Sequence, residues 1–190
     1  MSRAHVVVRA PRDSDVPALL DMWEELRQAS GRNGSLAPAS TEKRLVDRLA
    51  AIRGMAGCRL LIAELDGEVV GAAVFQARPM GPFHDDPMVQ IDYLHVRPGR
   101  NNRGVGHALM SAAVAFAEES GAEHVGVGVL PQLREAQRFY ARLGFSPLVM
   151  RRVASTAGLR RKLEPEPVVS RQLARVLARR RSVLRGPASG

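Results

Sequence analysis

Two glycines spaced two positions apart, Gly104 and Gly106, stand in a polar turn between an apolar run and a helical pattern. The run 89–96 is rich in β-branched and aromatic residues, which predicts a strand, and the residues after Gly104 have the period of a helix. Glycines let the backbone approach a ligand closely. The first N–H groups of a helix also lack partners and lie at the positive end of its dipole. The turn therefore predicts an anion site suited to a pyrophosphate.

The alternative for this turn is an ordinary strand-to-helix connection. The turn lacks the third glycine and the acidic residue of a dinucleotide-binding fingerprint, and no Gly-Lys-Ser/Thr follows it as in a P-loop. A glycine turn taken alone is therefore weak evidence for a ligand.

The tyrosine Tyr140 is a candidate general acid, because a phenol can give a proton to a leaving group. It lies in a predicted helix over 133–143, where the alternative is an aromatic side chain packed on a sheet. Strict alternation over 89–96 would divide the side chains between two faces, with Gln90, Asp92, Leu94 and Val96 on one and Ile91, Tyr93 and His95 on the other.

Asp92 has a carboxylate that could accept a proton, although a solvated or salt-bridged aspartate is an equal alternative. His84 is a weaker candidate, and His95 fits a core or edge histidine better. The histidines show no spacing typical of metal ligands, so no metal is predicted.

The elements that must position these residues follow the order β-α-α-β-β-β-α-β-α-β. Asp66 and Gly67 predict a tight hairpin, and Ser40 or Thr41 is expected to open the second helix. The predicted strands are 6–9, 60–65, 69–77, 89–96, 125–130 and 145–154, and the predicted loops are 31–39 and 79–87.

Two motifs in this order resemble the GCN5-related N-acetyltransferases. Val96-Arg97-Pro98 followed by Gly104-x-Gly106 is similar to that family's motif A, and 136–145, with Tyr140 and a Gly-Phe pair, looks like motif B. The resemblance covers 6–154. It implies an α/β fold in which a mixed, mostly antiparallel sheet is splayed at its fourth and fifth strands, with helices on both faces.

The resemblance implies an acetyl-CoA-dependent N-acetyltransferase acting on a primary amine of a small molecule or a protein. Tyr140 would be the general acid and Asp92 the base acting through water. Backbone groups would pair with the pantetheine arm at Leu94, His95 and Val96, and would cradle the pyrophosphate at Asn101, Asn102, Arg103, Gly104, Val105, Gly106 and His107. Asn101 and Leu133 depart from the family pattern, which has Arg or Gln at the first position and often Asn at the second.

The family places the acceptor among the first two helices, the loop 31–39 and the loop 79–87. Asp85 and Asp86 in the latter would favour a cationic amine, or they are simply a solvated turn.

The positive charge is concentrated at the end of the chain. Residues 1–150 contain 17 basic and 17 acidic residues, whereas residues 151–190 contain 11 basic and 2 acidic ones and carry all of the net +9. We expect an acetyltransferase domain over 1–155 and a basic, helical extension over 156–190. Residues 168–185 could bind nucleic acid, an anionic membrane or an acidic protein, or could pack on their own domain or a twin subunit in a homodimer.

The rival hypothesis is a catalytically weak or inert protein of this fold whose basic tail docks on nucleic acid or a ribonucleoprotein. The single cysteine, Cys58, excludes an internal disulfide and favours a reducing compartment. No signal peptide or membrane-length apolar run is visible, so the expected location is the cytoplasm.

Overall fold

The computed structural model describes residues 5–29, 40–100 and 103–164. The chain divides into two compact units, with the boundary between Gly144 and Phe145. Each unit is described separately below.

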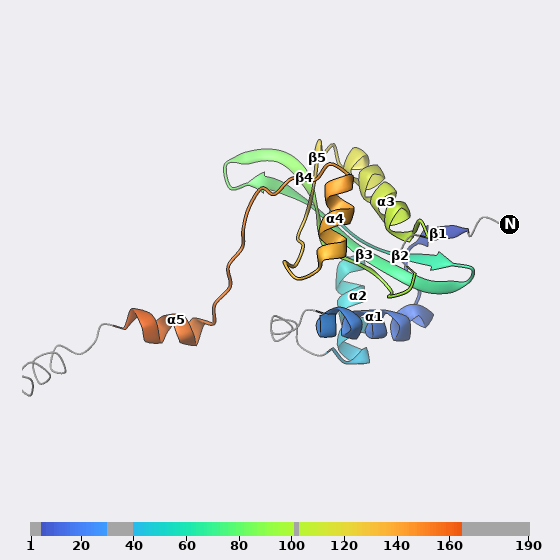
Figure 1. Cartoon of the computed structure of the whole chain (residues 1–190), viewed down its shortest axis with the longest axis horizontal. Coiled ribbons are helices and arrows are strands. Elements are labelled where there is room, and N and C mark those ends of the chain that lie inside the picture. Colours follow the sequence, from blue (N-terminus) through green and yellow to red (C-terminus); the bar gives the residue numbers. More distant parts are fainter. Residues whose placement is uncertain (1–4, 30–39, 101–102, 165–190) are drawn as a thin grey trace, which may run out of the picture. The chain divides into compact units, whose positions relative to one another are not determined.

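Within the described part of the first unit, five strands form one sheet in the order β1-β2-β3-β4-β5 (Figure 1). Neighbouring strands are antiparallel except β4 and β5, which are parallel. The strands are β1 Val6–Arg9, β2 Cys58–Leu65, β3 Glu68–Gly81, β4 His84–Val96 and β5 His124–Val127. The helices are a 3-10 turn at Asp13–Asp15, α1 Val16–Ala29, α2 Glu42–Arg53, α3 Val105–Glu119 and α4 Arg134–Arg142. This arrangement confirms the expected mixed sheet.

Two local signals in the sequence are confirmed, one at a hairpin turn and one at a helix N-terminus. Asp66 and Gly67 join β2 to β3 with φ values of 51° and 86°, as a tight hairpin turn requires. Thr41 caps α2, since its hydroxyl accepts a hydrogen bond from the Arg44 N–H at 3.4 Å.

Helices cover both faces of the sheet (Figure 1). On one face, α1 and α2 bury a cluster of apolar side chains against the sheet, namely Val16, Leu19, Met22, Leu49, Ile62 and Ala72. On the other face, α3 packs Phe116 against Phe75 of β3, with ring centroids 6.2 Å apart. The two faces are called below the α1/α2 face and the α3 face.

The β3–β4 hairpin is longer than the sequence predicted. The expected loop over 79–87 is wrong, because the strands continue through the pairs Pro79↔Pro87 and Gly81↔His84 and leave only a two-residue turn. Phe83 in that turn is 94% exposed. Backbone pairing between the two strands outweighs the turn-forming composition that suggested a loop.

β4 carries a β-bulge at Asp92. Ile91 pairs with Phe75 on the α3 face, but Val74, the residue before Phe75, pairs with Tyr93, so Asp92 is the extra residue. Tyr93 lies on the α1/α2 face, with its ring centroid 6.1 Å from that of Trp23. The predicted strict alternation is therefore wrong at this point, because the inserted residue turns Ile91 and Tyr93 to opposite faces.

β4 and β5 separate immediately after this bulge. Their parallel pairing runs from Met88↔His124 to Ile91↔Val127 and then ends. From Tyr93 to Val96, β4 stays paired with β3 on one edge and has no β5 partner on the other. We call this divergence the fork, and it confirms the splay expected between the fourth and fifth strands.

The second unit contains one described helix, α5 Thr156–Leu163, whose Ser155 hydroxyl accepts a hydrogen bond from the Gly158 N–H. The predicted strand over 145–154 is wrong, because these residues form no strand. Pro147 has no N–H to give, so a strand through this segment would lack one of its backbone hydrogen bonds. The rest of the predicted helical extension, including the segment 168–185, lies outside the described residues.

None of the described helices is both long enough and apolar enough to span a membrane.

Candidate functional site

The N-terminus of α3 presents backbone donors. Gly104 is its N-cap residue, with a φ of 84° in the left-handed region that favours glycine. The first helical hydrogen bond runs from the Ala108 N–H to the Gly104 carbonyl at 2.9 Å. The N–H groups of 105–107 precede that bond and lie at the positive end of the helix dipole.

The space in front of this turn suits an anionic group. A Cβ built on Gly104 would have no heavy atom within 4 Å, so the backbone there can be approached directly. Arg103 is exposed beside it. Asn101 and Asn102, also predicted to cradle the pyrophosphate, lie outside the described residues. The chemistry of the described donors fits a pyrophosphate.

The fork presents a second set of backbone groups. Leu94, His95 and Val96 pair with β3 on one edge, and β5 does not reach their other edge. In an antiparallel pair, alternate residues point their N–H and C=O groups away from the partner strand. An extended chain bearing amides could therefore pair with this edge of β4.

α4 lies against the first turn of α3 and carries the predicted acid. The Phe139 ring makes an edge contact with His107, with centroids 5.3 Å apart, and another with Tyr140 at 5.2 Å. Tyr140 is only 6% exposed, and burial raises the pKa of its phenol to about 12. The phenol therefore holds its proton at neutral pH, as a general acid must.

Asp92, the predicted base, lies at the bulge where the fork begins. Its Oδ1 accepts a hydrogen bond from Arg78 Nη2 of β3 at 3.2 Å. The other two base candidates are placed differently. His95 Nε2 is 2.9 Å from Glu25 Oε2 of α1, and His84 is exposed at the end of the hairpin, eight residues before Asp92 along β4.

Arg78 and Glu25 were not among the residues predicted from the sequence. Each meets its partner through a contact between elements distant along the chain, from β3 to β4 and from α1 to β4. Cross-strand register was the signal that could have found Arg78. The register shifts between Pro79 and Gly81, so counting from the hairpin turn would have misplaced Arg78.

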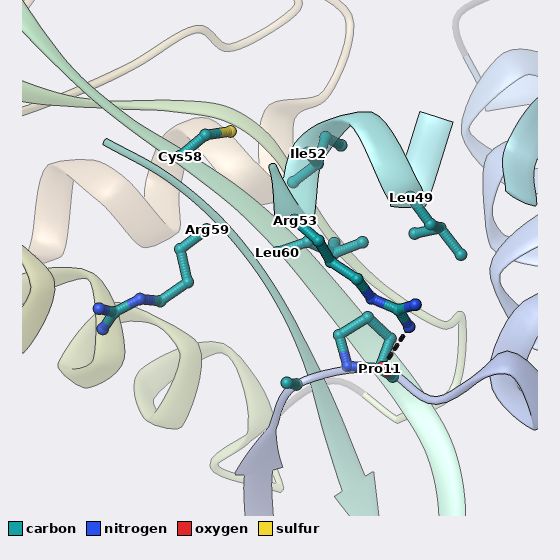
Figure 2. A pocket seen from close by; sticks show the side chains of 8 residues that line it. Pro11, Leu49, Ile52, Arg53, Cys58, Arg59 and Leu60 are labelled. Carbon is teal, nitrogen blue, oxygen red and sulfur yellow. Dashed lines mark hydrogen bonds between the residues drawn. The ribbon is translucent and has the colours of Figure 1, made fainter. Parts of the chain in front are cut away.

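A pocket of about 160 Å³ lies elsewhere, between α2, the start of β2 and the chain after β1 (Figure 2). Its lining is largely apolar, and the Arg53 guanidinium that enters it donates to the Pro11 carbonyl at 2.9 Å. Burial raises the pKa of the Cys58 thiol, and the charge of Asp92 acts in the same direction. A protonated thiol is a poor nucleophile. The pocket contains neither Tyr140 nor Asp92, so we do not assign the acyl chemistry to it.

Comparisons with known proteins identify the family and the fold. The family model described as "Acetyltransferase (GNAT) family" matches residues 20–145. An uncharacterized N-acetyltransferase of Mycobacterium tuberculosis (strain ATCC 25618 / H37Rv) is 37% identical over 86 residues, which are 45% of this chain and 51% of that protein. The chain thus spans about half the length of the curated relatives that it matches.

Solved structures share the fold at low identity. An aminoglycoside N-acetyltransferase in complex with CoA has a TM-score of 0.66 and 17% identity over 80% of this chain and 95% of that one. A glucosamine-6-phosphate N-acetyltransferase from Arabidopsis thaliana has a TM-score of 0.63 and 12% identity over 80% of this chain and 99% of that one. At these identities the likeness establishes the fold alone.

Proposed function

This chain belongs to the acetyltransferase (GNAT) family, and we propose that it transfers an acetyl group from acetyl-CoA to a primary amine of a small molecule or a protein. The observation that carries the proposal is the contact between the two motifs. Gly106 and His107, in the first turn of α3, lie against Phe139, and Phe139 lies against Tyr140. A phosphate-binding turn and a buried phenol are thereby held together.

The chain's backbone supplies the cofactor-binding groups. In the proposal, the N–H groups of Val105, Gly106 and His107 bind the pyrophosphate, and Arg103, Asn101 and Asn102 also contribute. The free edge of β4 at 94–96 pairs with the amides of the pantetheine arm. When bound, acetyl-CoA supplies an acetyl group activated as a thioester.

Two side chains are proposed to transfer the protons of the reaction. Asp92, at the fork, accepts a proton from the amine directly or through water, because an ammonium has no lone pair with which to attack. Tyr140 gives its proton to the departing sulfur, and its raised pKa keeps that proton available at neutral pH. Backbone N–H groups near Val96 polarise the thioester carbonyl.

The amine is proposed to approach from the α1/α2 face. This face carries the Glu25–His95 pair and the aromatic contact of Trp23 with Tyr93. Asp85 and Asp86 lie at the exposed end of the hairpin, where they would attract a cationic acceptor.

Native mass spectrometry of the chain, with and without acetyl-CoA, tests the cofactor site. We expect one acetyl-CoA per chain. A panel of small amines and lysine-containing peptides, followed by release of the CoA thiol, then tests transfer. Absence of an adduct at high ligand excess, or binding with no transfer to any amine, would contradict the proposal.

A further inference from the structure

We propose that Arg78 is a positioning residue that holds the Asp92 carboxylate at the fork, on the face from which the amine approaches. The inference rests on the proposed function, because Asp92 is the base in that reaction. It assigns to β3 a part in the chemistry that neither family motif contains.

The bulge determines where the Asp92 side chain can point. A bulge re-aims a side chain and interrupts pairing, and here it falls one residue past the last β4–β5 pair, Ile91↔Val127. Asp92 is therefore the first residue of β4 whose free edge is open to a ligand. Its side chain is less constrained than that of an ordinary paired strand residue, so a second group is needed to hold the carboxylate.

Arg78 is that second group. Its Cα pairs with Met88, so its side chain must run along the sheet, past the Gln76↔Gln90 pair, to reach Asp92. The distance covered is roughly 10 Å at the usual rise per strand residue. An extended arginine can span it, and Nη2 meets Oδ1 at 3.2 Å.

The pair lies on the α1/α2 face. Gln76, two residues before Arg78 and so on the same side of β3, contacts Met55 after α2 at 3.9 Å. Within the described residues, Asp92 accepts no hydrogen bond besides the one from Arg78. Oδ2 is thus left to accept a proton from the amine or from a bridging water, while Oδ1 is fixed.

An alternative is that the pair is an ordinary surface ion pair. The side chains are 34% and 42% exposed, and pairs of that kind contribute little to stability. Because such a pair contributes little to stability, an experiment can distinguish a surface ion pair from a positioning role. If Arg78 forms only a surface ion pair, its removal changes neither folding nor turnover. A positioning role predicts slower turnover in a protein that is still folded.

The test compares Arg78→Met, Arg78→Lys, Asp92→Asn and the double variant Arg78→Met/Asp92→Asn under saturating acetyl-CoA. We expect Arg78→Met to lower kcat roughly 10- to 100-fold with an unchanged KM for acetyl-CoA, as a misplaced catalytic group does. Arg78→Lys should recover part of the loss. The double variant should be no slower than Asp92→Asn, because Arg78 acts only through Asp92.

A matched control is Arg59→Met, which removes another sheet arginine paired with a carboxylate. Arg59 Nη2 bonds Glu119 Oε2 at 2.7 Å, and its guanidinium lies over Phe116 on the α3 face. This variant should keep its kcat. An unchanged kcat in Arg78→Met, or losses that add in the double variant, would overturn the positioning role while the wild-type chain still transfers acetyl groups. A wild-type chain that transfers none would instead overturn the proposed function, and this inference with it.

Discussion

Gly106 in the first turn of α3 packs against the ring of Phe139 in α4, so closely that a Cβ at position 106 would lie 3.2 Å from the Phe139 Cζ. Any larger residue must push the ring aside. Because Tyr140 follows Phe139, the absence of a side chain at position 106 helps to set the position of the proposed acid.

Gly106→Ala should therefore reduce activity through α4. We expect a loss of stability of about 1–3 kcal/mol from overpacking, together with a lower kcat. The measurement is thermal unfolding beside steady-state turnover. Phe139→Leu makes room for the new methyl group, so the double variant should lose less than the two single losses combined. Losses that simply add would show that the contact does not connect the helices.

Gly104→Ala should weaken acetyl-CoA binding for a different reason. The alanine Cβ would meet no protein atom within 4 Å, but the left-handed φ of 84° costs an alanine about 1 kcal/mol of stability. A domain of this size should lose roughly 2–4 °C in Tm. The Cβ would also stand where the pyrophosphate is proposed, raising the Kd for acetyl-CoA about ten-fold or more, measured by calorimetry.

Gly104→Asn separates the two effects, because asparagine adopts the left-handed region more readily than alanine does. Its Tm should lie closer to that of the wild type, while its Kd stays raised. A Kd restored along with the Tm would mean that strain, and not obstruction of the site, caused the weaker binding.

Tyr140→Phe should lower kcat by about 10²- to 10⁴-fold, the usual range for loss of a general acid. Burial raises the phenol's pKa to about 12, so the phenol stays protonated at every pH well below that value. The ratio of wild-type to variant kcat should therefore stay level from pH 7 to pH 10, measured at saturating acetyl-CoA. A ratio that falls toward one across that range would argue against the tyrosine as acid.

Asp15→Asn should destabilise the fold in a pH-dependent way. Asp15 is buried, and its carboxylate accepts hydrogen bonds from the Arg9 side chain at 2.7 and 3.1 Å and from the Arg12 N–H at 2.6 Å. These contacts, the Arg9 bond above all, hold the pKa of the carboxyl below its ordinary value. The stabilisation is present above the unfolded-state pKa and is lost as the pH falls through the folded-state pKa.

The expected loss for Asp15→Asn is about 2 kcal/mol at pH 7, measured by urea unfolding, and it should shrink as the pH is lowered below about 4. Asp13→Asn is the control. Asp13 pairs with Arg53 at 3.3 Å but is 86% exposed, so its loss should stay under about 0.5 kcal/mol at either pH. Equal losses at both positions would contradict the role given to burial.

The sequence by itself determined the features that depend on neighbouring residues. The Asp66–Gly67 turn, the Thr41 cap and the glycine turn before α3 are all local, because each is specified by backbone preferences within a few positions. The order of elements up to α4 followed from periodicity, and the mixed sheet splayed between its fourth and fifth strands followed from the resemblance that the two motifs carry.

The tertiary structure decided what depends on partners far along the chain. The bulge at Asp92 exists only through pairing with β3, and it puts Ile91 and Tyr93, which were predicted to share a face, on opposite faces. Arg78 meets Asp92, and Glu25 meets His95, across elements whose register no local pattern specifies. The segment 145–154 has the composition of a strand but forms none, since a strand exists only where a neighbouring strand pairs with its backbone.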